Sequence, residues 1–261
     1  MTKDLNFELY GESKGKNTLL IAHGLFGSSK NWKSIARRIS ETGRQVVIVD
    51  MRNHGLSFWS DNHGYKDMAQ DLIRVINMFG GCVDLIGHSM GGKAAMALAL
   101  MYPSHIGKLI VVDISPVKYT HNQSDYITAM EAVDLSVIEN RKDVDTQLSR
   151  YVKDARLRAF FTQSIDFSQI PLIKWRINLK AIKKNIDQIM SFPSFNSKRL
   201  RPTLFLRGSI SEYISNSNLG AIKNYFPSFQ LVTVVGASHW VHAENPNAFY
   251  ESVMEFLQEG I

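Results

Sequence analysis

Continuous apolar runs alternate along the chain with segments in which apolar residues recur every three or four positions. The runs are typical of strands that are covered on both faces of a parallel sheet, and the segments between them are typical of amphipathic helices. Because the two kinds alternate, the pattern predicts an α/β domain with a mostly parallel, twisted sheet and helices on both faces. The predicted strands cover residues 18–22, 45–50, 83–86, 108–113, 203–207 and 229–235.

The segments between these runs predict the helices of the same domain. One helix, capped by Ser28 or Ser29, follows the first run, and others are predicted over residues 66–78, up to Tyr102, and over 246–258. Residues 5–10 alternate between apolar and polar and predict a half-exposed edge strand. Residues 11–17 are polar with two glycines, which predicts a hairpin-like turn after that strand.

The alternation stops after Pro116 and resumes at about residue 200. Between these points the chain has helix-like segments over residues 126–133, 143–161 and 177–190, and no β-branched apolar run. We therefore predict one core domain, made of residues 1–116 and 200–261, and a helical insertion over residues 117–199.

The sequence Gly87-His88-Ser89-Met90-Gly91 is the strongest candidate for chemistry. It reads G-x-S-x-G, it follows an apolar run, and it precedes a strong helix former, so that strand, sharp turn and helix meet at Ser89. A nucleophilic serine in such a turn needs small neighbours, which Gly87 and Gly91 supply. The alternative is a chance match to a short pattern.

A serine hydroxyl needs a base, and His239 is the best candidate. It directly follows the last predicted strand, at the sheet edge that also presents Ser89. His242 is the nearest rival, and a histidine on a surface loop is the alternative for both. The orienting acid should also follow a strand, as Asp113 does; Glu212, after the next strand, is the second candidate. We expect Asp50, which precedes Ser89 in the chain, to brace Arg52 instead.

Two backbone amides are expected to stabilise developing negative charge on a substrate oxygen. The amide of Met90 lies at the start of the helix after Ser89, and the amide of Leu25 lies in the glycine-containing loop after the first apolar run. That loop could alternatively form only a turn. The residues predicted to contact substrate flank these positions: His23, Gly24, Phe26, His88 and Trp240.

Composition and charge narrow the class of protein. The chain has 261 residues, of which 44% are hydrophobic, and can bury a large core. Its net charge of +6 would suit nucleic acid, but there is no basic run at either end and no nucleic-acid motif, so no such partner is expected. No apolar run reaches the roughly 18 residues of a membrane span. The first residues do not resemble a signal peptide and Cys82 is the only cysteine, so we expect a cytoplasmic protein without an internal disulfide.

Four motifs together resemble the α/β-hydrolase superfamily: His23-Gly24, the segment Asp50-x-Arg52-x-His54-Gly55-x-Ser57, the pattern around Ser89, and His239-Trp240. Residues 112–116 and 239–242 are also similar to the small esterase group that includes bacterial YbfF and the ABHD11-type hydrolases. The resemblance implies the α/β-hydrolase fold, Asp113 as the acid, and hydrolysis of a small-molecule ester or thioester through an acyl-enzyme on Ser89, without metal or cofactor. Asn53 departs from the family pattern, since many relatives have glycine there.

In this superfamily an insertion resembles a cap over the active site. Residues 150–201 hold twelve lysines and arginines against three aspartates, so Lys180, Lys183 and Lys184 could face the phosphates of an acyl-CoA or simply be solvated. Trp175, Phe160, Phe161, Phe192 and Phe195 could line an acyl tunnel or hold the cap together. A C–C bond hydrolase or lyase, or a small-molecule-binding protein without turnover, remain the alternatives to an esterase. We expect a monomer or a weak homo-oligomer.

Overall fold

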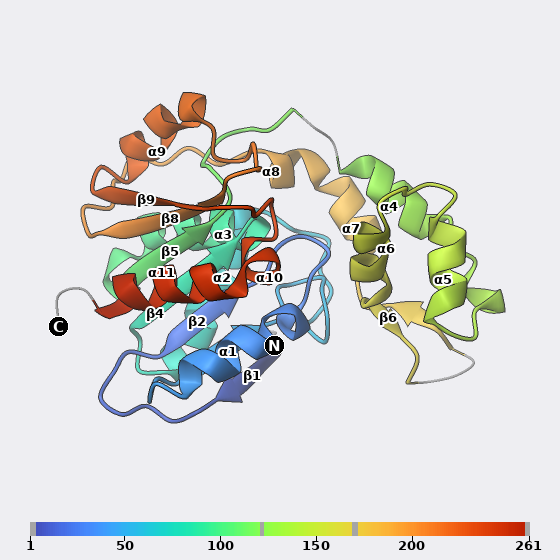
Figure 1. Cartoon of the computed structure of the whole chain (residues 1–261), viewed down its shortest axis with the longest axis horizontal. Helices are drawn as coiled ribbons and strands as arrows, with labels where there is room; N and C mark the ends of the chain where they lie inside the picture. The colour runs from blue at the N-terminus through green and yellow to red at the C-terminus, as the bar shows by residue number, and fades with distance from the viewer. Residues whose placement is uncertain (1–3, 121–122, 169–171, 259–261) are drawn as a thin grey trace.

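The computed structural model describes residues 4–120, 123–168 and 172–258, and a seven-stranded sheet forms its centre (Figure 1). The strand order is β1-β3-β2-β4-β5-β8-β9, and every neighbouring pair is parallel except β1 with β3. The predicted strands are confirmed with small changes at their ends: β1 (Phe7–Tyr10), β2 (Leu19–Ala22), β3 (Val46–Val49), β4 (Val83–His88), β5 (Ile106–Val112), β8 (Thr203–Gly208) and β9 (Phe229–Val234).

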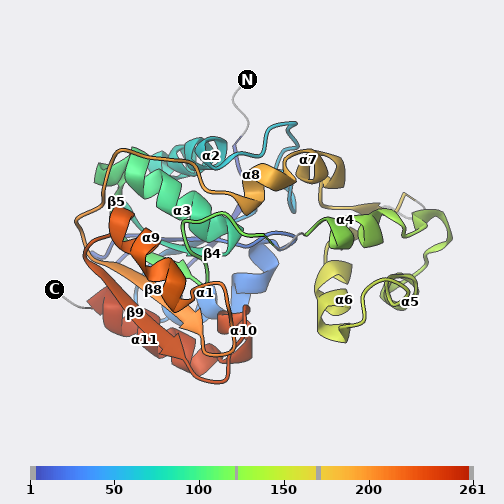
Figure 2. The same cartoon turned by 90° about the horizontal axis from the view of Figure 1, so that it is seen from above.

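Helices cover both faces of the sheet, as Figure 2 shows most plainly. One face carries α1 (Lys33–Ser40), which follows the short 3-10 helix η1 (Ser29–Trp32), and α11 (Pro246–Gln258). The opposite face carries α2 (Tyr65–Met78), α3 (Met90–Met101) and α9 (Leu219–Tyr225). Alternate residues of each strand supply the two cores: Leu19 and Ile21 pack toward α1 and α11, whereas Leu20 and Ala22 pack toward α2 and α3. A parallel sheet buried on both faces explains the continuous apolar runs.

The hairpin-like turn predicted for residues 11–17 is wrong. The edge strand β1 pairs antiparallel with β3 and not with β2, so residues 11–17 carry the chain past β3 instead of joining neighbouring strands. The two glycines have positive φ angles, 67° at Gly11 and 76° at Gly15, and so allow the chain to turn there. Turn residues alone do not determine which strand pairs with β1.

The inserted segment (residues 117–199) lies between β5 and β8 and extends to one side of the sheet in Figures 1 and 2. It contains α4 (Ser124–Glu131), α5 (Arg141–Leu148), α6 (Ala155–Thr162), α7 (Leu179–Lys184) and α8 (Ile186–Met190). The helix-like segments 143–161 and 177–190 are each split in two. Asp154 starts α6 by accepting a hydrogen bond from the amide of Arg156, and the chain turns at Asn185 between α7 and α8.

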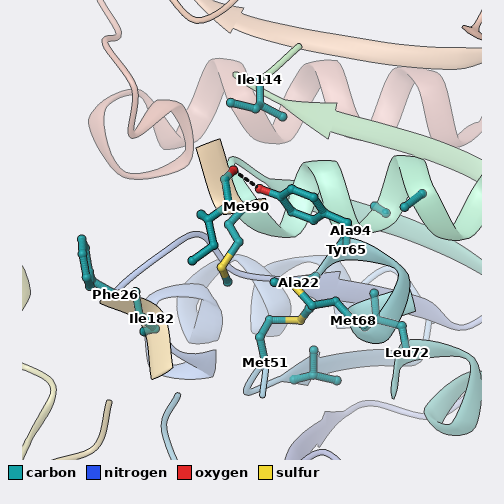
Figure 3. Close-up of a cluster of buried hydrophobic side chains, with 14 of the residues drawn as sticks. Ala22, Phe26, Met51, Tyr65, Met68, Leu72, Met90, Ala94, Ile114 and Ile182 are labelled. Atoms are coloured by element: carbon teal, nitrogen blue, oxygen red, sulfur yellow. Dashed lines mark hydrogen bonds between the residues drawn. The ribbon is translucent and has the colours of Figure 1, made fainter. Parts of the chain in front are cut away.

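The inserted segment also holds a short antiparallel pair, β6 (Ile165–Asp166) with β7 (Lys174–Trp175), which the sequence pattern did not predict. Two-residue strands are too short to show an alternating pattern. The segment shares a core with the sheet: Figure 3 shows Ile182 of α7 in the same cluster as Phe26, Met68 and Met90. In that figure the Tyr65 hydroxyl donates a hydrogen bond to the carbonyl of Ile189 in α8.

Candidate active site

Ser89 lies on the sharp turn between β4 and α3 that the sequence predicted. Its backbone has φ 52° and ψ −117°, an unfavourable conformation for a residue with a side chain. The turn has no room for larger neighbours, because a Cβ on Gly87 would lie 2.3 Å from the carbonyl oxygen of Gly91, and a Cβ on Gly91 would lie 2.4 Å from that of Ala22. The two glycines therefore allow the turn that presents the Ser89 side chain.

Three predicted side chains form one hydrogen-bonded row. The Oγ of Ser89 lies 3.0 Å from Nε2 of His239, and Nδ1 of His239 lies 2.7 Å from Oδ2 of Asp113. Asp113 directly follows β5 and is fully buried, with a positive φ of 51°. Its carboxylate also accepts hydrogen bonds from the Gly208 amide at 3.1 Å and from the Ser211 hydroxyl at 2.5 Å. These donors fix the carboxylate that faces the imidazole.

Further contacts hold His239, and sequence reasoning missed them. The ring of Tyr213 stacks on the imidazole at 3.9 Å between centroids. Nε2 of His88 lies 2.9 Å from the backbone oxygen of His239 and donates to it. The carboxylate of Glu244 accepts hydrogen bonds from the amide and hydroxyl of the preceding residue, Ser238. Tyr213 directly follows Glu212 in the loop after β8. An aromatic residue in a loop has no sequence pattern that would indicate stacking on a distant histidine.

The two rival candidates are not part of this hydrogen-bonded row, although His242 lines the same cavity as Ser89. Glu212 is exposed and lines a separate surface hollow, whereas Asp113 is the carboxylate within hydrogen-bonding distance of His239 among the described residues. His242 is buried and its ring stacks on Trp32 at 4.0 Å, where burial lowers its pKa to about 3. The expected contact between Asp50 and Arg52 is wrong. Asp50 accepts from the backbone amides of Ser29 and Leu56, and Arg52 pairs with Asp71 of α2.

Asn53, the position noted as a departure from the resemblance, has a positive φ of 65°. Asparagine tolerates this conformation better than most residues do, which explains how it can replace glycine. Its backbone oxygen and its Oδ1 both accept hydrogen bonds from Asn178, at 3.0 and 3.1 Å. The side chain of Asn53 therefore adds one hydrogen bond to the inserted segment, beyond the one that its backbone makes.

The loop that was predicted to supply an oxyanion amide (residues 23–27, called the oxyanion loop below) lies directly against Ser89, since a Cβ on Gly24 would lie 3.2 Å from that of Ser89. His23 accepts a hydrogen bond from the Met51 amide at Nε2, so its Nδ1 carries the proton and donates to the carbonyl of Gly24 at 2.8 Å. The Gly24 carbonyl and the Leu25 N–H belong to one trans peptide group, in which C=O and N–H point in opposite directions. The bond to His23 therefore directs the Leu25 N–H away from the loop interior. No partner for that amide lies within the described residues.

A cavity of about 810 Å³ opens beside Ser89. All five residues predicted to contact substrate line it, although both ring nitrogens of His23 are bonded to backbone groups. Phe160 and Phe161 of α6 also line it. Trp175, Phe192 and Phe195 are not among the described lining residues and pack within the fold instead. The rest of the apolar and aromatic lining comes from Leu25, Trp32, Tyr65, Met90, Ile114, Tyr119, Tyr126, Leu157, Ala159, Ile189, Met190, Tyr213 and Ala243.

The three lysines that could have faced a phosphate follow the other alternative, that of a solvated helix face. Lys180, Lys183 and Lys184 are exposed on α7 and are absent from the described lining of the cavity, and Lys183 pairs with Glu131 at 2.6 Å. Among the described residues, the lysines and arginines that line the cavity are Lys30, Lys93 and Arg156.

Lys93 is a buried cation that sequence reasoning missed. It lies in the first turns of α3 and donates to the carbonyls of Val117, Met190 and Ser191 at 2.9, 3.0 and 2.7 Å. These carbonyls lie where the inserted segment leaves the core and where its last helix ends. Burial lowers the pKa of Lys93 to about 7. A lone lysine in an otherwise apolar helix was the available signal.

Two kinds of feature are absent from the described residues. No helix there is long and apolar enough to cross a bilayer. No group of three or more histidine, cysteine, aspartate or glutamate side chains is arranged to hold a metal ion.

Comparisons with known proteins agree with this geometry. Residues 17–139 match the model of a family described as alpha/beta hydrolase fold. The chain is 40% identical to the sn-1-specific diacylglycerol lipase ABHD11 of Mus musculus, over 97% of this chain and 85% of that protein. It is 32% identical to esterase YbfF of Escherichia coli, over 92% of this chain and 93% of that protein. A solved structure described as a marine microorganism esterase is 40% identical, with a TM-score of 0.93, and covers 98% of this chain and 100% of its own. The chain therefore belongs to the α/β-hydrolase family and, within it, to the esterase- and lipase-type hydrolases.

Proposed function

We propose that this protein is a serine hydrolase that cleaves carboxylic esters or thioesters through an acyl-enzyme on Ser89. The observation that carries the proposal is the continuous row from Ser89 through His239 to Asp113, which lies beside an unpaired backbone amide and opens into a largely apolar cavity. A protein that only bound a small molecule would need neither the row nor the strained turn at Ser89.

In the proposed mechanism, Ser89 attacks the acyl carbonyl while Nε2 of His239 takes its proton. The buried carboxylate of Asp113 accepts a hydrogen bond from Nδ1–H of His239, stays ionised and stabilises the imidazolium. The amides of Leu25 and Met90 donate to the tetrahedral oxyanion, and the start of α3 adds its helix dipole there. His239 then gives the proton to the leaving alcohol or thiol, and water repeats the steps to release the acid.

The cavity supports an acyl group of substantial size. Its aromatic lining from α6 and from Tyr126 of α4 belongs to the inserted segment, which we propose acts as a cap over the site, with residues 1–116 and 200–261 as the core. One relative is named for diacylglycerol, an ester with long apolar chains, which suits such a lining. For an acyl-CoA thioester, Lys30 and Arg156 are the cavity-lining cations that would meet phosphates, because Lys93 is buried and bonded to three backbone carbonyls.

A substrate panel combined with covalent labelling tests the proposal. The purified chain and its Ser89→Ala variant are assayed with p-nitrophenyl esters of two to sixteen carbons and with acyl-CoA thioesters. A fluorophosphonate probe is added in parallel, and the labelled peptide is identified by mass spectrometry. We expect turnover and labelling at Ser89 in the wild type and neither in the variant. Turnover that survives Ser89→Ala, or a wild type that shows neither, would refute the proposal.

A further inference from the structure

Phe26, in the middle of the oxyanion loop, has the backbone conformation of a glycine. Its φ is 63°, a value that a side chain makes unfavourable. Such a conformation persists only where the surrounding contacts determine it, and it is often found where a protein positions a functional group. The contacts that hold Phe26 therefore also determine where the adjacent amide of Leu25 lies.

One of these contacts comes from the core. The Phe26 amide donates to Nε2 of His54 at 3.2 Å. His54 can accept because its other nitrogen, Nδ1, donates to the carbonyl of Arg52 at 2.9 Å, which fixes the tautomer. The ring is fully buried, and burial lowers its pKa well below the ordinary value, so it stays neutral and keeps its acceptor.

The other two contacts come from the inserted segment. The hydroxyl of Ser164, between α6 and β6, donates to the carbonyl of Phe26 at 3.1 Å. The ring of Phe161, in α6, meets the Phe26 ring edge-on at 5.5 Å. Ser164 is itself held by the backbone, since its amide donates to Phe161 and its carbonyl accepts from Arg176. Both peptide groups of Phe26 are thus held, one from the core and one from the inserted segment.

We infer that Ser164 and His54 are positioning residues for the oxyanion loop, so that the inserted segment supports transition-state stabilisation and does not only roof the cavity. This inference rests on the proposed function, in which the Leu25 amide binds the oxyanion. It predicts that loss of the Ser164 hydroxyl weakens the binding of a tetrahedral species and leaves the binding of ground-state ligands intact. If Ser164 were only a structural anchor, or only shaped the acyl pocket, its loss would weaken the binding of tetrahedral species and of ground-state ligands alike.

The test compares Ser164→Ala with Ser164→Thr, which keeps a hydroxyl, and with Ser168→Ala as the matched control. Ser168 lies in the same segment, but its hydroxyl donates to Asp166 and not to the oxyanion loop. Active sites are counted with the fluorophosphonate, so that misfolded protein does not enter kcat. Each variant is then measured for kcat and KM with a short p-nitrophenyl ester and for inhibition by an alkyl trifluoromethyl ketone, which forms a tetrahedral adduct, and by the matching secondary alcohol, which cannot.

We expect Ser164→Ala to lower kcat roughly five- to tenfold with KM within about twofold, as loss of one hydrogen bond would. The inhibition constant of the ketone should rise by the factor by which kcat/KM falls, while that of the alcohol stays constant. Ser164→Thr should recover most of kcat, and Ser168→Ala should resemble the wild type.

His54→Gln and His54→Leu are compared in the same way. The Oε1 of the glutamine can accept the hydrogen bond from the Phe26 amide, so His54→Gln should have a higher kcat per titrated site than His54→Leu. An unchanged kcat in Ser164→Ala, a rise in KM alone, equal weakening of ketone and alcohol, or a Thr variant as slow as Ala would each overturn the inference. A wild type that the fluorophosphonate does not label would instead refute the proposed function.

Discussion

Asp113→Asn tests the proposed role of the buried carboxylate most directly. In the wild type, the carboxylate accepts hydrogen bonds from the Gly208 amide, the Ser211 hydroxyl and Nδ1 of His239. An asparagine of the same shape can keep its oxygen toward the Gly208 amide, which places its NH₂ group where Oδ2 was. That donor faces His239, so the imidazole must present a lone pair at Nδ1 and carry its proton on Nε2. In this tautomer His239 cannot accept the proton of Ser89.

The size of the loss follows from that tautomer change. In a serine protease, the corresponding substitution lowers kcat by about 10⁴, which is about 5.5 kcal/mol of transition-state stabilisation. We expect a loss of this order here, because Asp113 is fully buried and water cannot replace it. Glu212→Gln is the matched control. Glu212 is exposed and lines a different hollow, so kcat should stay within about twofold of the wild type.

The assay is kcat for p-nitrophenyl butyrate at pH 7.5, with thermal unfolding followed by circular dichroism to confirm that each variant is folded. An Asp113→Asn variant that folds and keeps more than a tenth of wild-type kcat would show that another group orients His239. A Glu212→Gln variant that loses as much as Asp113→Asn would contradict the assignment in the same way.

Three further predictions concern stability. Lys93→Met removes the buried donor for three part-buried carbonyls and should lower the free energy of unfolding by about 2–4 kcal/mol in urea titrations at pH 7; an unchanged midpoint would contradict this. Buried His242 has a pKa of about 3 against an unfolded value of 6.5, so the unfolded state binds more protons between these values and stability falls as pH drops below 6.5. In His242→Phe, which keeps a stacked ring, the loss of stability between pH 7.5 and 5 should be smaller by about 2 kcal/mol, and an identical loss would refute the pKa argument. Gly91→Ala should abolish folded, active protein because its Cβ would lie 2.4 Å from the carbonyl oxygen of Ala22, whereas Gly220→Ala, with open space, should be tolerated.

Much of the fold and the reacting row could be predicted because their signals are local. A strand buried on both faces is apolar throughout, so the six parallel strands were visible as runs. The turn at Ser89 needs two small residues at fixed spacing, and this requirement is visible in the sequence as Gly87 and Gly91. Since parallel strands end at one edge, His239 and Asp113 could be placed beside Ser89 from their positions after strands.

Contacts between distant segments left no such signal. The pairing of β1 with β3, the ion pair of Arg52 with Asp71, and the three carbonyls around Lys93 each depend on which segments the fold brings together. Likewise, the breaks between α5 and α6 and between α7 and α8 come from capping and tertiary packing, which can override helical periodicity. The sequence therefore predicted which groups meet at the candidate site more completely than which groups hold them there.

The backbone shows why the supporting groups matter. Within the described ranges, four residues other than glycine have a positive φ: Phe26, Asn53, Ser89 and Asp113. They follow the carboxyl ends of β2, β3, β4 and β5, four adjacent strands at the centre of the sheet. Each such conformation costs of order 1–3 kcal/mol, and a sheet with a core on each face can bear it. The strain is thus confined to the edge where the proposed reaction takes place, and the contacts that maintain it, including those from the inserted segment, determine the geometry of the site.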